Sequence, residues 1–173
     1  MTLQLLLVED SYGVEFHNVL LRMILGKHSL RVDRLPAREC NPAIVRKIRG
    51  MLLDGDVSKA KIVVVVDAEN QDRNVVRERI LMHFRSRYPP HEHQVRVVTV
   101  NPRHESWLCI GLGLERGKCR QIPEDIIVRE RRLKSYEKRY LAQLARYIDT
   151  SKLGSEEDFK EYLKALEWLT KDP

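Results

Sequence analysis

Five consecutive apolar residues, Ile62 to Val66, constrain the fold of this chain more than any other feature. A strand with one face in water alternates polar and apolar residues, and this run does not alternate. Both faces of the strand must therefore be covered, as they are in the interior of a parallel sheet that carries helices on either side. A second apolar strand is predicted in LQLLLVED, and it ends at Glu9.

Strand and helix patterns alternate along the chain as far as Asn101. The expected strands are LQLLLV, LRVDRLP, residues 61–66 and QVRVVTVNP. The expected helices between them cover residues 13–26, 42–51 and 75–88, and we expect Asn74 to cap the last of these and Pro89-Pro90 to end it. This alternation predicts a Rossmann-like α/β fold, with a parallel sheet of about four strands flanked by helices. Beyond Asn101, helices are expected at residues 104–112, 126–147 and 156–169. We therefore expect an α/β domain at residues 1–115 and a helical C-terminal extension packed on it at residues 116–173.

Acidic residues follow the two most apolar strands. Glu9 closes the first, and Asp67, Glu69 and Asp72 follow the second. The carboxyl ends of parallel strands meet at one crevice, which is the usual ligand site of such sheets. Clustered carboxylates repel one another, so they either raise a pKa or bind a hard cation such as Mg2+. The simplest structural alternative is that Glu9 and Asp67 only stabilise helix N-termini.

The positive charge of the chain is concentrated in one segment. The formal net charge is +6 with a pI near 9.3, and the basic excess lies mainly between Arg116 and Arg146. This pattern favours contacts with nucleic-acid phosphates, although a solvated helix face in a charge-rich protein would look similar. Tyr136 and Tyr140, one helical turn apart, would either stack on bases or pack the helix. The predicted nucleic-acid-binding residues are Arg103, Lys118, Arg120, Arg131, Arg132, Lys134, Lys138 and Arg139.

The cysteines and the apolar segments indicate an intracellular protein. Cys40, Cys109 and Cys119 form neither a CxxC motif nor an even set, which argues for reduced thiols and against a disulfide or zinc site. No apolar run approaches the roughly 20 residues that span a membrane. The start of the chain lacks the basic region and cleavage site of a signal peptide. We therefore expect a cytoplasmic protein without membrane contact.

Three segments together resemble Toprim proteins. LLLVEDS and IVVVVDAEN resemble the two Toprim signature motifs, a Glu that ends the first strand and an Asp-x-Asp pair that ends the third. VNPRHESWLCIGLG is similar to a segment of RloB-like stand-alone Toprim proteins. The tail, SYEKRYLAQLARYID and DFKEYLKALEWL, resembles the helical C-terminus of those proteins. The wider Toprim group includes topoisomerases, primases and OLD-type nucleases.

The resemblance implies an Mg2+-dependent or Mn2+-dependent protein that acts on DNA or RNA, with nuclease-like phosphodiester hydrolysis in defence or repair. Carried over by position, Glu9, Asp67 and Glu69 are the catalytic residues. The implied metal ligands are Glu9, Asp67, Glu69, Asp72 and Glu105. An ATPase partner and a homodimer are also compatible with the resemblance. The chain departs from the pattern at Glu69, where the motif has Asp, and at Asp10 and Gly13.

Two alternative functions remain open at the level of sequence. One is a metal-dependent nucleic-acid-binding module without turnover. The other is a response-regulator-like receiver, in which Glu9 and Asp10 hold Mg2+ beside a phosphorylated Asp67, with Thr99 on the next strand. A receiver also needs a lysine at the end of a fifth strand, whereas here Asn101-Pro102 leads into a helix.

Overall fold

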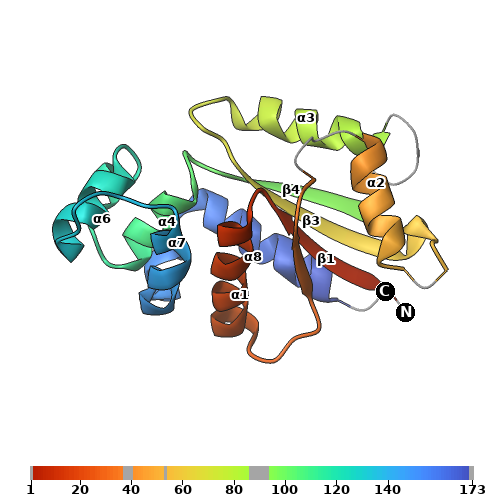
Figure 1. The fold of residues 1–173 in the computed structure, drawn as a ribbon, viewed down its shortest axis with the longest axis horizontal. Helices are drawn as coiled ribbons and strands as arrows, with labels where there is room; N and C mark the ends of the chain where they lie inside the picture. The colour runs from red at the N-terminus through yellow and green to blue at the C-terminus, as the bar shows by residue number, and fades with distance from the viewer. Residues whose placement is uncertain (1, 37–40, 53, 86–93, 172–173) are drawn as a thin grey trace.

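A computed structural model describes residues 2–36, 41–52, 54–85 and 94–171 of the 173-residue chain. Four parallel strands form one sheet in the order β2-β1-β3-β4 (Figure 1). The strands are β1 (Leu3–Val8), β2 (Arg31–Arg34), β3 (Ala60–Asp67) and β4 (Val95–Val100). The Rossmann-like α/β prediction is confirmed, and β1 and β3 hold the two central positions.

Different helices cover the two faces of the sheet (Figure 1). On one face, α2 (Asn41–Gly50) and α3 (Arg73–Arg85) pack on residues such as Leu5 and Val64. On the other, α1 (Ser11–Leu25), α4 (His104–Gly111) and α8 (Glu157–Thr170) pack on residues such as Leu6 and Val65. This division follows from the alternation of side chains along a strand. Each residue from Ile62 to Val66 is at most 2% exposed, so each contributes about 1.5–3 kcal/mol of burial free energy.

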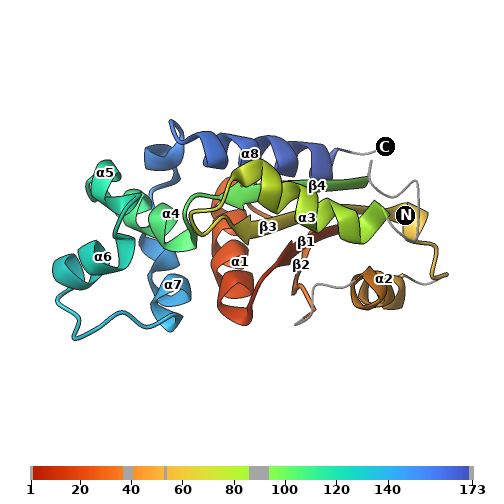
Figure 2. The ribbon, with the colours of Figure 1, turned by 90° about the horizontal axis from the view of Figure 1, so that it is seen from above.

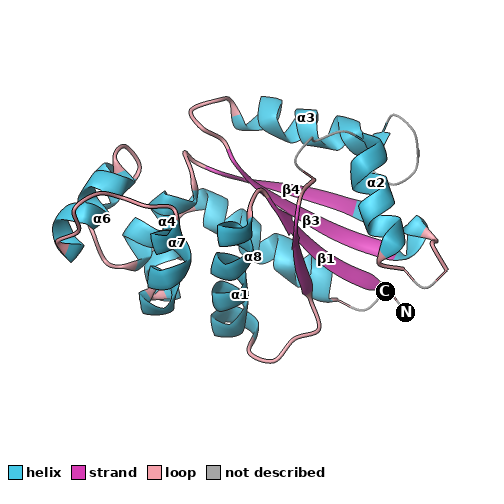
Figure 3. Cartoon of the chain, viewed as in Figure 1, coloured by secondary structure: helices cyan, strands magenta, loops and turns pink. Residues whose placement is uncertain are grey.

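The segment after α4 contains short helices and a long connection. It comprises α5 (Arg116–Cys119), α6 (Pro123–Arg131), α7 (Arg139–Leu144) and 3-10 turns at Ala145–Tyr147 and Thr150–Leu153. The prediction of one helix over residues 126–147 is wrong, because Arg132 adopts a left-handed backbone with φ of 53° and ends α6. Figure 3 shows the loop that separates α6 from α7. None of the described helices is long and apolar enough to cross a lipid bilayer.

Cys109 and Cys119 form a disulfide that joins α4 to α5. The expectation of reduced cysteines is therefore wrong for this pair, whereas Cys40 lies outside the described residues. The turn at Gly113, with φ of 85°, folds α5 back on α4, and the two Cα atoms lie 5.5 Å apart, a separation that suits a disulfide. Counting cysteines could not reveal this, because an odd total conceals a pair.

Candidate functional site

Glu9 and Asp67 meet at the carboxyl end of the two central strands. Val8 pairs with Val65 in the sheet, and the Asp67 backbone N–H donates to Glu9 Oε1 at 3.2 Å. Figure 2 shows α4, α5, α6 and α7 gathered beyond this end of the sheet, away from the chain termini. We refer to Glu9, Asp67 and Glu69 as the carboxylate cluster. All three come from the sequence prediction, and the structure brings them to one end of the sheet.

The two carboxyl groups at the strand ends have opposite pKa shifts. Partial burial and the neighbouring Asp67 charge raise the pKa of Glu9 to about 7. Burial also opposes ionisation of Asp67, but the charge and hydrogen bonds of His104 outweigh it and lower the pKa of Asp67. One acid is therefore ionised at neutral pH while the other is poised to exchange a proton.

Glu69 lies in a strained turn directly after β3. Its φ is 50° and that of Asn70 is 65°, a left-handed conformation that non-glycine residues adopt at a cost. Two backbone bonds tie the turn to the end of β4: Ala68 N–H donates to the Val100 carbonyl at 2.8 Å, and Glu69 N–H to the Pro102 carbonyl at 2.8 Å. Partial burial and the Asp67 charge raise the pKa of Glu69.

Asp67 is the end of a buried chain of polar side chains that the sequence did not predict. His104 donates to Asp67 Oδ1 from its backbone N–H at 2.9 Å, and its Nδ1 lies 2.6 Å from the same oxygen. His104 Nε2 lies 2.7 Å from His17 Nε2, and His17 Nδ1 lies 2.8 Å from the Tyr162 hydroxyl. Burial lowers the pKa of His17. Burial also acts to lower the pKa of His104, but the charge and hydrogen bond of Asp67 outweigh this effect, and the pKa of His104 is raised. We refer to Tyr162, His17 and His104 as the histidine chain.

Glu105 is held by a lysine and a tyrosine. Its side chain is 2% exposed, and its Oε1 accepts from Lys138 Nζ at 2.8 Å and from the Tyr136 hydroxyl at 3.1 Å. Burial acts to lower the pKa of Lys138, but the charge and hydrogen bond of Glu105 outweigh it and raise that pKa. Among the described residues, nothing hydrogen-bonds Glu105 Oε2. Glu105, which we expected to be a further metal ligand, thus holds the Lys138 ammonium group near the carboxylate cluster.

Two other acids near the strand ends cap helices. Asp10 Oδ1 accepts from Gly13 N–H at 2.7 Å at the start of α1. Asp72 Oδ1 accepts from Asn74 N–H at 2.8 Å and from Val75 N–H at 3.3 Å at the start of α3. Asp72 rather than Asn74 therefore caps this helix, and the cap engages the Asp72 carboxylate that we expected to assist with metal. The expected end of the helix at Pro89-Pro90 lies outside the described residues.

Several of the predicted nucleic-acid contacts are engaged within the protein. Arg103 forms a two-pronged ion pair with Glu124. Arg120 binds both oxygens of the buried Asp158 at 2.9 Å. Lys118 and Arg139 make exposed ion pairs with Glu115 and Glu137, which stabilise little. Among the described residues, Arg132 and Lys134 have no acidic partner, and both are exposed.

An exposed tyrosine on the same segment lies close to two guanidinium groups. Tyr147 is 50% exposed, with Arg131 5.0 Å and Arg146 4.9 Å from its ring centroid. The sequence prediction had named Tyr136 and Tyr140 as stacking candidates. Tyr136 instead binds Glu105, and its ring lies 6.1 Å from that of Tyr140. Sequence reasoning did not single out Tyr147, the exposed aromatic ring that Arg131 and Arg146 contact.

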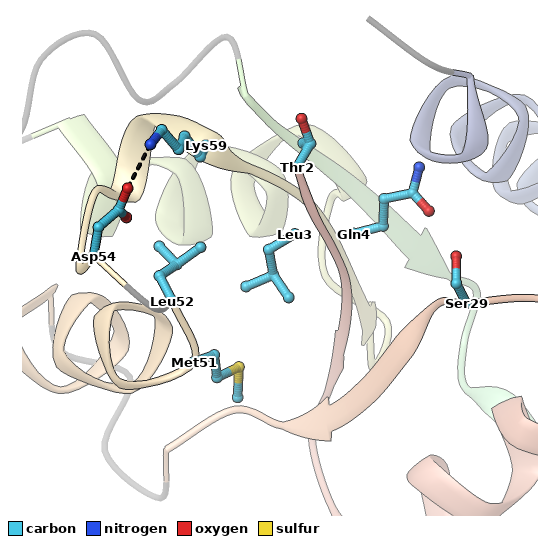
Figure 4. A pocket seen from close by; sticks show the side chains of 8 residues that line it. All are labelled: Thr2, Leu3, Gln4, Ser29, Met51, Leu52, Asp54 and Lys59. Carbon is cyan, nitrogen blue, oxygen red and sulfur yellow. Dashed lines mark hydrogen bonds and ion pairs between the residues drawn. The ribbon is translucent and has the colours of Figure 1, made fainter.

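A pocket of about 280 Å3 lies at the opposite end of the sheet, where β1 and β3 begin. Leu3, Met51 and Leu52 supply its apolar walls, and an ion pair between Lys59 and Asp54 closes one side (Figure 4). Lys59 and Asp54 neutralise each other, and the other described residues that line the pocket include no acid or base. The chemistry therefore concentrates at the carboxyl end of the sheet.

The carboxylate cluster fits a partly hydrated Mg2+ better than a closed metal cage. Within the part of the chain that the structure describes, no group of three or more His, Cys, Asp or Glu residues is arranged to hold a metal ion. Mg2+ is usually held by one or two carboxylates, with waters and substrate phosphates as its other ligands. Asp67 and Glu69 offer the hard oxygen donors that such an ion requires, next to Glu9, whose pKa is raised by partial burial and by the Asp67 charge.

The sequence located the acids of this site and missed most of their partners. His104 stands beside Glu105 in NPRHES, directly after β4, and this position was a usable signal. His17 lies on the apolar face of α1 among Phe16, Leu20 and Leu21, where a histidine is conspicuous. Comparisons with protein-family models, with curated proteins and with solved structures found no match for this chain.

Proposed function

We propose that this protein hydrolyses phosphodiester bonds in nucleic acid with the help of Mg2+ or Mn2+ at the carboxylate cluster. The observation that carries the proposal is the pair of strand-end acids, in which Glu9 has a pKa of about 7 beside an ionised Asp67. A general base works best when its pKa lies near the working pH. The Toprim resemblance supports the same assignment of these residues.

The acids of the cluster and the neighbouring lysine would have different roles in this reaction. Asp67 and Glu69 would hold the cation, which when bound neutralises phosphate oxygens as a Lewis acid. Glu9 would take a proton from the attacking water, because its carboxyl group lies beside Asp67 at the strand ends and is not one of the groups proposed to hold the cation. Lys138 is 38% exposed and would attract a phosphate to the cluster while its ammonium stays on Glu105.

The basic segment supports nucleic acid as the substrate. Residues 116–147 contain ten Lys or Arg and four Asp or Glu, so this segment accounts for the whole net charge of +6. Arg131 and Arg146 lie 5.0 and 4.9 Å from the centroid of the exposed Tyr147 ring, so the segment combines an aromatic ring for a base with cations for the neighbouring phosphates. Because a stacked base must be unpaired, we expect single strands to be preferred over duplexes.

The test is cleavage of fluorescent single-stranded and double-stranded DNA and RNA during a titration with Mg2+ or Mn2+. We expect metal-dependent cleavage by the wild type and a loss of at least about 100-fold in Asp67→Asn and Glu9→Gln. Glu15→Gln, which changes an exposed acid on α1, is the matched control and should cleave normally. Metal-dependent binding without cleavage would leave the module without turnover as the function.

The receiver alternative gains no support from the site. Asp67 is 7% exposed, and both His104 bonds end on one of its oxygens. Thr99 is buried, and its hydroxyl accepts a hydrogen bond from Arg73 at 2.9 Å. Mass spectrometry after incubation with a small phosphodonor would detect an aspartyl phosphate on Asp67, and we expect none.

A further inference from the structure

The histidine chain links four elements through the protein interior. Tyr162 comes from α8, His17 from α1, His104 from α4, and the chain ends on Asp67 of β3. Tyr162 and His17 are fully buried, and His104 is 4% exposed. Polar groups are costly to bury, and apolar residues would fill this space at lower cost. Their presence on a direct line to the carboxylate cluster points to a role at that cluster.

The direction of the hydrogen bonds follows from Asp67 Oδ1, which already accepts from the His104 backbone N–H. A carboxylate can only accept, so His104 Nδ1 must carry a proton and donate it to Oδ1. The two Nε2 atoms of His104 and His17, 2.7 Å apart, then share a single proton. Whichever ring carries that proton, His104 Nδ1–H stays on Asp67.

The ring of His104 is fixed by its neighbours. Phe16 lies edge-on at 5.6 Å between ring centroids, and Trp107 lies at 5.8 Å. His17 holds the far nitrogen, and the His104 backbone N–H donates to the same Asp67 oxygen as the ring does. The imidazole therefore has one available orientation, and it can fix the carboxylate that it contacts.

We propose that His104 is a positioning residue for Asp67, held in place by His17 and Tyr162. Both His104 bonds end on Oδ1, and among the described residues no hydrogen bond ends on Oδ2. The chain thus assigns one Asp67 oxygen to the protein and leaves the other for a cation or a substrate. For its effect on cleavage, this inference rests on the function proposed above.

The first experiment reads the hydrogen bonds directly. Long-range nitrogen–proton NMR of 15N-histidine-labelled wild type should show His104 protonated at Nδ1, with that proton far downfield of the amides. Tyr162→Phe removes only the hydroxyl that meets His17 Nδ1, so it should change the His17 signals and leave His104 Nδ1 protonated. An unprotonated His104 Nδ1 would overturn the proposal.

The second experiment separates positioning from folding. His104→Asn can keep a donor where Nδ1 stands, whereas His104→Leu removes it. Mn2+ affinity, followed by electron paramagnetic resonance, should fall about 10–100-fold in His104→Leu and be largely restored in His104→Asn. Cleavage should follow the same order in kcat, with KM for nucleic acid unchanged, because the basic segment stays intact.

His28→Leu is the matched control, since His28 lies at the opposite end of the sheet and, within the described part of the chain, accepts a hydrogen bond only from the nearby Leu30 N–H. It should retain wild-type Mn2+ affinity. A folded His104→Leu that binds Mn2+ and cleaves like the wild type would overturn the positioning role alone. A wild type that neither binds Mn2+ nor cleaves would overturn the proposed function, and the positioning role with it.

Discussion

At the scale of single residues, Glu9 should make the stability of the protein depend on pH. It is the residue after β1, its side chain keeps an exposed face, and its carboxyl group still has a pKa near 7 because of partial burial and Asp67. A carboxyl group that only capped a helix would have a lowered pKa, because the positive end of the helix stabilises its charged form. In the structure Asp10, not Glu9, caps α1.

Glu9 should make the protein less stable as the pH rises from mildly acidic values toward neutrality. A carboxyl group with a raised pKa binds its proton more tightly in the folded chain, so the free energy of unfolding falls between about pH 4.5 and pH 7. Glu9→Gln should remove about 1 kcal/mol of this decrease, a reduced figure because solvent screens the exposed face. Chemical denaturation at several pH values measures the difference.

Glu15→Gln is again the control, and its stability should vary with pH in parallel with the wild type. If the Glu9→Gln curve also ran parallel to the wild type, Glu9 would have an ordinary pKa. Saturating Mg2+ should move the wild-type decrease to lower pH if a cation binds at the cluster, because a nearby positive charge lowers a carboxyl pKa.

At the scale of elements, α4 connects the site to the C-terminal helices. All eight of its residues are buried, among them His104 and Glu105 at its first turn and Cys109 near its end. Gly111, the last residue of α4, packs closely on Ile148, which follows the 3-10 turn after α7. A Cβ added at Gly111 would lie 2.7 Å from Ile148 Cγ2. A shift of α4 would therefore move the partners of Asp67 and the basic segment together.

The Cys109–Cys119 disulfide should stabilise the attachment of α5 to α4. Replacing both cysteines by alanine should lower the free energy of unfolding by about 2–3 kcal/mol, the loop entropy expected for a ten-residue separation. Denaturant titration measures the loss. Thiol labelling of unfolded, unreduced protein should detect a single reactive cysteine, and labelling of all three would disprove the disulfide.

At the scale of the whole molecule, the charge is asymmetric. Residues 116–147 carry the entire excess of +6, and the remaining residues sum to zero. This segment lies beyond the carboxyl end of the sheet (Figure 2), on the side of the carboxylate cluster. The positive field can thus draw a polyanion toward the end of the sheet that carries the acids.

Nucleic-acid affinity should depend on salt through this segment. The triple variant Arg131→Ala, Arg132→Ala, Lys134→Ala should reduce the slope of log affinity against log salt by about 2 for single strands, since each lost phosphate contact removes about 0.7. Fluorescence anisotropy over a range of salt concentrations measures the slope.

An equal charge change on α8 and the residue after it, in Lys160→Ala, Lys164→Ala, Lys171→Ala, is the matched control and should leave the slope nearly unchanged. Tyr147→Ala should instead weaken single-strand binding by about 1–3 kcal/mol at a similar slope, because stacking releases no counterions. Equal slopes in the two triple variants would exclude residues 116–147 as the binding surface.

The sheet and the position of its acids were predictable from local sequence patterns. An unbroken apolar run such as Ile62 to Val66 permits only a strand covered on both faces, and strand ends of a parallel sheet converge, so Glu9 and Asp67 had to meet. The partners of these acids, in contrast, depend on how distant parts of the chain pack together. His17, His104 and Tyr162 come from three separate helices, and their convergence on Asp67 depends on packing between elements that no local pattern encodes. The break at Arg132 and the Cys109–Cys119 pair are likewise set by how α4, α5 and α6 pack together.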